Sequence, residues 1–256
     1  MKTLFPAVLV LALAFSGCKK DETPTPVTPT PSPAIRVSFT NVVGADPLTL
    51  GGPNYYINAH GDSFYVTTYK YYVSNIKFTD NNGNTWSEPE SYHLINAADP
   101  NSLSFNVSGM PAATYTSMQF MIGVDSARNV SGAQTGALDP ANDMFWTWNT
   151  GYIMAKFEGK SPQSTASAHN LTFHIAGYSG ANAVQRIVSP TFASLTANPT
   201  ATLTPVIHIK SDVLEWFVNP NTIRFDTMNN VATTGASAMQ IADNYADMFT
   251  ITGIDN

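Results

Sequence analysis

The histidines and tryptophans of this sequence are the side chains with the most capacity for chemistry beyond packing. In residues 171–175 apolar side chains alternate with polar ones, so His174 points away from the apolar face of a predicted strand. His208 is placed in the same way between two isoleucines. A neutral imidazole on such a face can bind a metal ion, and an ordinary solvated histidine fits the same pattern. The pattern alone therefore leaves both interpretations open.

Two tryptophans, Trp146 and Trp148, end a long segment, 123–149, that has no clean periodicity. Loops of this length inside a compact domain are usually functional or disordered, and the density of aromatic residues in 144–148 argues against disorder. If the end of the segment is extended, both indoles project from one face of it. An aromatic pair within a core has the same spacing, so the pair does not by itself identify a site.

Motifs of the common enzyme classes do not occur in the sequence. There is no Gly-x-Ser-x-Gly nucleophile motif and no complete Gly-x-x-x-x-Gly-Lys-Ser/Thr phosphate loop. Asp139 and Asp143 lie in the long segment, but their spacing selects neither a glycosidase nor a calcium site. The 12 basic residues are scattered and the net charge is −6, which is unsuited to nucleic acid. The sequence predicts a protein that is not an enzyme and does not bind nucleic acid.

The single cysteine, Cys18, follows a basic start and an apolar run over residues 4–15. That run has signal-peptide length and is too short to span a bilayer, and residues 15–18 resemble a bacterial lipobox. We expect a lipoprotein signal peptide over residues 1–17 and a lipid on Cys18. The lipid would anchor the protein to the outer membrane, on its periplasmic or cell-surface side. Residues 18–34 contain five prolines and predict an extended Pro/Thr-rich tether.

Short β-strands dominate the structure predicted for residues 35–256. Runs rich in Tyr, Val and Ile are separated by turn residues about every ten positions, and Asn82-Gly83 between two such runs predicts a hairpin. Short helices are expected at 213–218 and, from four apolar side chains at helical spacing, at 241–249. The pattern predicts an all-β domain, an immunoglobulin-like or related β-sandwich with one or two short helices and a long aromatic-rich loop. Predicted strands also cover 102–107, 114–122, 152–157, 171–175 and 205–209.

Seven segments between about residue 35 and the C-terminus carry a family resemblance. The most specific is Met144-Phe145-Trp146-Thr147-Trp148-Asn149-Thr150-Gly151-Tyr152. The others cover residues 48–51, 71–76, 122–126, 136–140, 157–159 and 173–175. In content and in order these segments resemble the MbnP family of bacterial periplasmic and surface proteins, and the chain is most similar to its Bacteroidetes lipoproteins.

The resemblance implies a connection with copper. Some studied members of the family bind copper with histidines and with a tryptophan that a partner dihaem peroxidase-like enzyme has oxidised to kynurenine. By position, the resemblance implies a lipid-anchored cell-envelope protein that sequesters or hands off copper. The alternative is a non-metal extracellular binding or adhesion module, in which 123–149 forms a pocket for a partner or a sugar. The implied copper-site residues are His174, Trp146 and Trp148, with His93 and His60 as further candidates.

Overall fold

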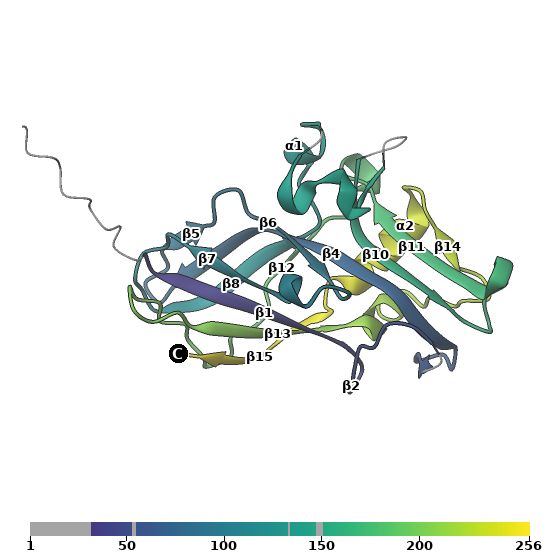
Figure 1. The fold of residues 1–256 in the computed structure, drawn as a ribbon, viewed down its shortest axis with the longest axis horizontal. Helices are drawn as coiled ribbons and strands as arrows, with labels where there is room; N and C mark the ends of the chain where they lie inside the picture. Colours follow the sequence, from purple (N-terminus) through teal and green to yellow (C-terminus); the bar gives the residue numbers. More distant parts are fainter. Residues whose placement is uncertain (1–31, 53–54, 133, 147–150) are drawn as a thin grey trace, which may run out of the picture. The chain divides into compact units, whose positions relative to one another are not determined.

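The computed structural model describes residues 32–52, 55–132, 134–146 and 151–256, and most of these form β-strands in two sheets (Figure 1). Within that part of the chain, one sheet has five strands in the order β15-β13-β1-β2, with β7 paired to β1. The other has ten, in the order β12-β8-β4-β10-β11-β14, with further strands paired to β4 and β10. This is the β-sandwich architecture that the strand pattern predicts.

The elements have the following bounds. The five-stranded sheet contains β1 (Ala34–Val43), β2 (Asp46–Pro47), β7 (Ser104–Ser108), β13 (Val206–Asp212) and β15 (Phe249–Asp255). The ten-stranded sheet contains β3 (Tyr56–Ile57), β4 (Ser63–Asp80), β5 (Thr85–Ser87), β6 (Tyr92–Asn96), β8 (Tyr115–Ile122), β9 (Phe145–Trp146), β10 (Gly151–Lys160), β11 (Asn170–Ala176), β12 (Arg186–Val188) and β14 (Asn230–Val231). The helices are α1 (Ser126–Asn129), α2 (Ala236–Tyr245), and the 3-10 helices η1 (Pro100–Leu103), η2 (Gly136–Leu138), η3 (Pro140–Asn142), η4 (Ser167–His169), η5 (Gly180–Asn182) and η6 (Val213–Phe217).

The long strand β4 organises the larger sheet. It pairs with β10 near its start and with β8 near its end, and the turn after Asp80 leads directly into β5. The Asn82-Gly83 hairpin predicted from the sequence is therefore confirmed. Because successive side chains of a strand point to opposite faces, Tyr69 and Tyr71 face the core between the sheets, whereas Lys70 and Tyr72 lie on the outer face.

Aromatic side chains fill the space between the sheets. The ring of Phe39 from β1 lies 6.0 Å from that of Tyr71, 6.4 Å from that of Phe120 and 5.9 Å from that of Phe249. Trp216 of η6 packs against Tyr69 and Phe157 of the larger sheet and against Tyr245 of α2. These rings are buried, so the two sheets share one apolar core.

The two predicted helices differ in outcome. The one expected at 213–218 forms as η6, where the Asp212 carboxylate accepts a hydrogen bond from the Leu214 N–H at 3.1 Å. The one expected at 241–249 was wrong in its bounds, because α2 covers Ala236–Tyr245 and Phe249 begins β15. The main-chain N–H of Asp212 donates to the Met248 carbonyl, so sheet pairing takes over from the helix at that point. None of the helices in the described residues is long and apolar enough to cross a membrane.

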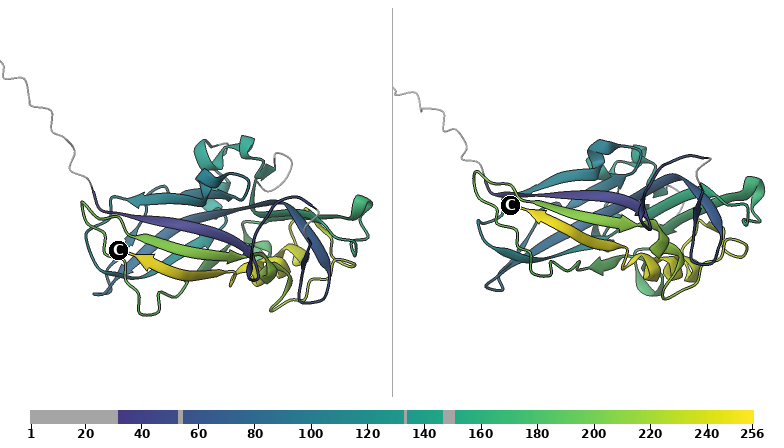
Figure 2. Two further views of the ribbon diagram at one scale, coloured as in Figure 1. Left: turned by 60° about the horizontal axis from the view of Figure 1, so that its bottom comes forward. Right: turned by 90° about the horizontal axis from the view of Figure 1, so that it is seen from below.

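The segment that follows β8 covers part of the outer face of the larger sheet. It forms α1, η2, η3 and β9 before the chain enters β10. The Tyr72 hydroxyl donates to the Ala137 carbonyl at 3.2 Å, and the Tyr152 hydroxyl donates to the Leu138 carbonyl at 2.8 Å. Figure 2 shows this segment on the side of the molecule away from β13 and β15. The described part of this segment is a cover built from short helices, and this agrees with the prediction, made from its aromatic content, that it is not disordered.

Candidate functional site

Strand register brings His174 into a row of polar side chains on the outer face of the larger sheet. Lys70 of β4 pairs with Lys156 of β10, and Lys156 pairs with His174 of β11. Two residues further along β10, Glu158 pairs with Thr68. Because alternate residues of a strand share a face, all five side chains lie on the face away from the core. The alternation in the sequence predicted this side for His174.

His174 lies within hydrogen-bond distance of a carboxylate and beside an indole. Its Nε2 is 2.7 Å from Oε1 of Glu158, and the other Glu158 oxygen accepts a hydrogen bond from the Thr68 hydroxyl at 2.9 Å. The imidazole is 6.5 Å from the ring of Trp146, measured between centroids, and only 17% of the His174 side chain is exposed. Two of the residues implied by the resemblance, His174 and Trp146, therefore meet at one place.

Two lysines hold the end of the covering segment against the sheet next to this pair. The ammonium group of Lys156 donates to the main-chain carbonyl of Asp143 at 2.7 Å and to its carboxylate at 2.6 Å. Lys70 donates to the carbonyl of Asn142 at 2.9 Å. The Lys156 side chain is 2% exposed, whereas that of Asp143 is 78% exposed. These contacts position the residues just before Trp146, and so they help to place the indole over His174.

Burial and neighbouring charges keep His174 neutral. Burial is the main cause that lowers the pKa of His174 below its ordinary 6.5; the Lys156 charge lowers it further, and Glu158 partly opposes both. For Glu158, burial raises the pKa, but hydrogen bonds from His174 and Thr68 lower it more, so the pKa lies below its ordinary 4.5. In both cases the unfolded chain binds protons more readily. The stability that these two groups contribute is therefore fully present above about pH 6.5 and is lost as the pH falls below their ordinary pKa values.

Opposite substitutions should move the His174 pKa in opposite directions. We expect Lys156→Met to raise it, because a neighbouring positive charge is removed, and Glu158→Gln to lower it, because a negative acceptor is removed. The measurement is an NMR titration of the His174 ring protons. Lys160→Met is the matched control on the same strand, because Lys160 is not among the charges that affect His174. A Lys156→Met protein with an unchanged His174 pKa would contradict this account.

The other two candidate histidines lie elsewhere. His93 of β6 pairs with Val73, which is an odd number of residues from Lys70, so its ring is on the opposite face of the sheet from His174. There it stacks on Phe105 at 3.5 Å and contacts Glu88 at 2.8 Å. His60 is exposed in the turn between β3 and β4, roughly 20 Å along β4 from Lys70 at 3.3 Å per residue. Neither histidine joins His174 in one site.

Two predicted residues lie outside the described part of the chain. They are Trp148 and the expected lipidation site Cys18. The predicted leader over residues 1–17 lies outside it too, as does most of the tether.

Of this cluster, the analysis of motifs identified only His174 and Trp146, and it missed Thr68, Lys70, Asp143, Lys156 and Glu158. Lys156 and Glu158 flank the buried Phe157, so alternation along β10 indicates that both share one outward face. This alternation could have been recognised in the sequence, because the predicted strand 152–157 contains Lys156 and ends one residue before Glu158. Asp143 carries no such signal, because its contact with Lys156 depends on how the covering segment folds back.

The cluster supplies some but not all of the donors that copper prefers. The imidazole of His174 and the carboxylate of Glu158 are suitable ligands, whereas an intact indole has no lone pair to offer. Among the described residues, no group of three or more His, Cys, Asp or Glu side chains is placed to hold a metal ion. Ring-opening of a tryptophan would add an aromatic amine and a ketone. The residues thus fit copper if a modified tryptophan completes the site.

Comparisons with known proteins agree on one family. The family model MbnP matches residues 32–240. Among solved structures, MbnP from Methylosinus trichosporium has a similar fold, with a TM-score of 0.54 and 12% sequence identity over 87% of this chain and 98% of that one. No curated protein is significantly similar in sequence. The family model spans most of the chain and agrees with the segments that carry the resemblance, so this protein belongs to the MbnP family.

Proposed function

We propose that this protein is a lipid-anchored cell-envelope protein that binds copper at His174 and sequesters it or hands it on. The observation that carries the proposal is the proximity of His174 and Trp146, which are 28 positions apart in the sequence yet lie 6.5 Å apart between ring centroids. Family membership supports it, since the matched range contains both residues, which the resemblance implies as copper-site residues. Lipid on Cys18 would keep this site outside the cytoplasm.

The charges of the cluster cancel one another, and this suits a site that one further ligand completes. Lys70 and Lys156 carry two positive charges, and Glu158 and Asp143 carry two negative charges, so with a neutral His174 the cluster has no net charge. A neutral imidazole is the form that binds copper, and the lowered pKa of His174 keeps it in that form at neutral pH. When bound, copper would provide a Lewis-acidic and redox-active centre, and the proposed role is storage or transfer without turnover.

Copper titration of the full chain tests the proposal. We expect protein from the native host to bind copper, and His174→Ala to weaken binding at least tenfold, because an imidazole ligand is lost. The matched control is His208→Ala, since His208 is also a strand histidine that contacts a carboxylate, here Asp255 at 2.9 Å, but it lies in the smaller sheet. Stoichiometric binding that survives His174→Ala would exclude this site.

Intact-mass measurement of the same native protein tests the modification. We propose that a dihaem peroxidase-like partner opens the ring of Trp146 or Trp148 with two equivalents of peroxide as the oxidant. The C2–C3 and N1–C2 bonds of the indole break, C2 leaves as formate, and water is the other product. The resulting kynurenine differs in mass from tryptophan by the gain of one oxygen atom and the loss of one carbon atom. Trp146→Phe and Trp148→Phe, expressed in the same host, would identify the residue. The same measurement reports whether Cys18 carries lipid. A mass with no ring-opening product would remove kynurenine from the proposal.

The binding module is the second candidate, and one observation favours it. Residues of the covering segment and of the larger sheet line a polar pocket of about 300 Å³ that includes Tyr92, Arg128 and Gln134. The Arg128 guanidinium lies 4.8 Å from the centre of the Tyr92 ring and donates to Gln134 at 3.0 Å. If native protein binds no copper, this pocket becomes the leading candidate. A neighbouring gene for a dihaem peroxidase would favour copper, and polysaccharide-uptake genes would favour the binding module.

A further inference from the structure

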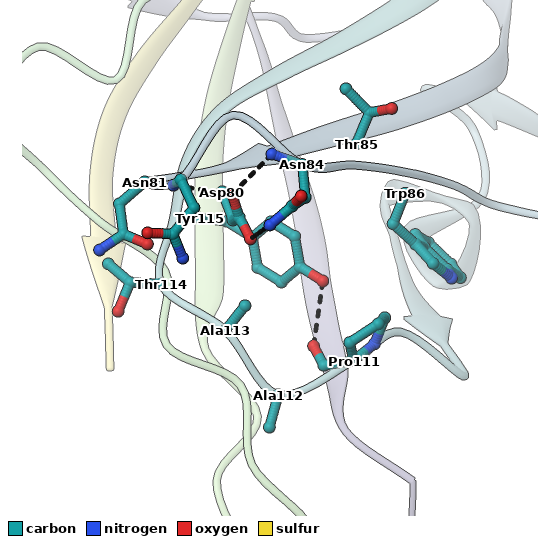
Figure 3. Close-up of a pocket in the computed structure, with 11 residues that line it drawn as sticks. Asp80, Asn81, Asn84, Thr85, Trp86, Pro111, Ala112, Ala113, Thr114 and Tyr115 are labelled. Atoms are coloured by element: carbon teal, nitrogen blue, oxygen red, sulfur yellow. Dashed lines mark hydrogen bonds between the residues drawn. The ribbon is translucent and has the colours of Figure 1, made fainter.

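A second pocket lies at the far end of β4, away from His174. The turn between β4 and β5 and the segment that leads into β8 enclose a volume of about 400 Å³ (Figure 3). Asp80, at the rim of this pocket, is ten residues along β4 from Lys70, or roughly 30 Å at 3.3 Å per residue. The volume is within the range of small-molecule sites. The pocket is thus separate from the proposed copper site and does not depend on it.

One side of the pocket is apolar and the other is polar. Trp86 and Pro111 provide ring surfaces, and in Figure 3 Trp86 stands across from Asp80 and Asn84. Trp86 is partly buried against the core, so its indole is held in place while part of it faces the pocket. The polar lining consists of amide and hydroxyl side chains: Asn81, Asn82, Asn84, Thr85 and Thr114.

The walls are fixed by hydrogen bonds before any ligand arrives. The Asp80 carboxylate accepts from the main-chain N–H groups of Asn82 and Asn84, both at 2.8 Å, and from the Asn84 side chain at 2.9 Å. On the opposite strand, the Tyr115 hydroxyl donates to the Pro111 carbonyl at 3.0 Å. A pre-formed pocket loses less entropy when it binds a ligand.

The charge of the pocket limits the class of ligand. No lysine or arginine is among the residues that line it, and Asp80 is its one carboxylate. The Asn84 amide, together with the main-chain N–H groups of the turn, lowers the pKa of Asp80, so this carboxylate stays ionised and occupied by the turn. The groups left for a ligand are neutral amides, hydroxyls and a ring face. An anion would find no cationic partner there.

We propose that this pocket binds a neutral pyranose unit of a saccharide. One face of a pyranose ring is rich in C–H groups and packs on an indole, while its hydroxyls donate to and accept from amides and hydroxyls. The Trp86 face and the Asn84 and Thr114 side chains offer these two kinds of surface in one pocket. The ligand class follows from this arrangement and requires no metal.

Titration with neutral oligosaccharides tests the proposal. The probes are maltotriose, cellotriose and chitotriose, added at millimolar concentrations to the full chain and followed by NMR shifts of the Asn84 and Trp86 side-chain N–H signals. We expect at least one probe to bind, Trp86→Ala to weaken it more than tenfold, and Tyr55→Ala to leave it unchanged. Tyr55 is the control because it is an exposed aromatic residue that does not line the pocket.

A second variant guards against misfolding. Ala112 is exposed on the pocket wall, so Ala112→Tyr should fill the pocket without disturbing the core and should also abolish binding. Binding that persists in both Trp86→Ala and Ala112→Tyr would overturn the proposal, and so would the absence of binding for all three probes. His174→Ala should have no effect on saccharide binding, which separates this result from that of the copper titration.

Discussion

Trp216→Ala is expected to lower the free energy of unfolding by about 3–5 kcal/mol. Trp216 is fully buried, and its ring lies 5.7 Å from that of Tyr69, 6.1 Å from that of Phe157 and 5.3 Å from that of Tyr245. Its indole N–H also donates to the Tyr69 hydroxyl at 3.3 Å. The substitution would leave a cavity where β4, β10 and α2 meet, because side chains from all three elements would lose the same partner.

Denaturant unfolding followed by circular dichroism measures this loss. Trp216→Phe keeps a ring in the cavity and should be less destabilising than Trp216→Ala. Leu195→Ala is the surface control, since Leu195 is 40% exposed and its truncation should change stability by no more than about 0.5 kcal/mol. A loss below about 1 kcal/mol for Trp216→Ala would mean that η6 is not part of the shared core.

Gly159→Ala is expected to destabilise the larger sheet by about 1–3 kcal/mol, towards the upper end of that range. A Cβ at this position would lie 2.2 Å from the main-chain carbonyl oxygen of Tyr65, so strand β4 itself would have to move. The register between β4 and β10 is irregular between Glu158 and Gly159, and the close approach of the two strands occurs at this point. A glycine is required because of this contact between backbones.

Gly253→Ala is the matched control within a strand. A Cβ there would meet only the His208 ring at 3.9 Å, an ordinary contact, so the substitution should be close to neutral. Urea unfolding compares the two variants. Because Gly159 follows Glu158, we also expect Gly159→Ala to disturb the Glu158–His174 pair and to shift the His174 pKa in an NMR titration. Equal stability of the two alanine variants would contradict the proposed strand contact.

Local pattern predicted the parts of this fold that depend on neighbouring residues. Alternation placed His174 on an outward face, and Asn82-Gly83 marked the hairpin between β4 and β5. Helical spacing failed at Phe249, because pairing with Ser211 of β13 outweighs a local preference for helix. Where strand pairing and a local helical pattern favour different structures for the same residue, the sequence alone does not show which one forms.

The candidate site, too, was predictable from the sequence only in part. The types of its residues, an imidazole on a strand and an indole near the end of a long segment, are visible in the sequence together with the family resemblance. The partners of His174 are not, since Glu158 comes from the neighbouring strand through register and Trp146 arrives through the fold of the covering segment. For the same reason the sequence alone could not show that His93 and His174 lie in different places. In the structure, the β4 residues that align with them, Val73 and Lys70, are an odd number of positions apart, so the two histidines lie on opposite faces of the sheet.

By itself, the sequence determined an all-β chain with few charges and a single cysteine, because composition and short-range periodicity depend only on neighbouring residues. Its motifs and the match to the family model place it in the MbnP family. The tertiary structure decided which side chains meet. It joined His174 to Glu158 and Trp146, separated it from His60 and His93, and formed the pocket beside Trp86. The physical reason is that contacts between distant segments follow from strand register and from the packing of the core, and both are settled only when the whole chain folds.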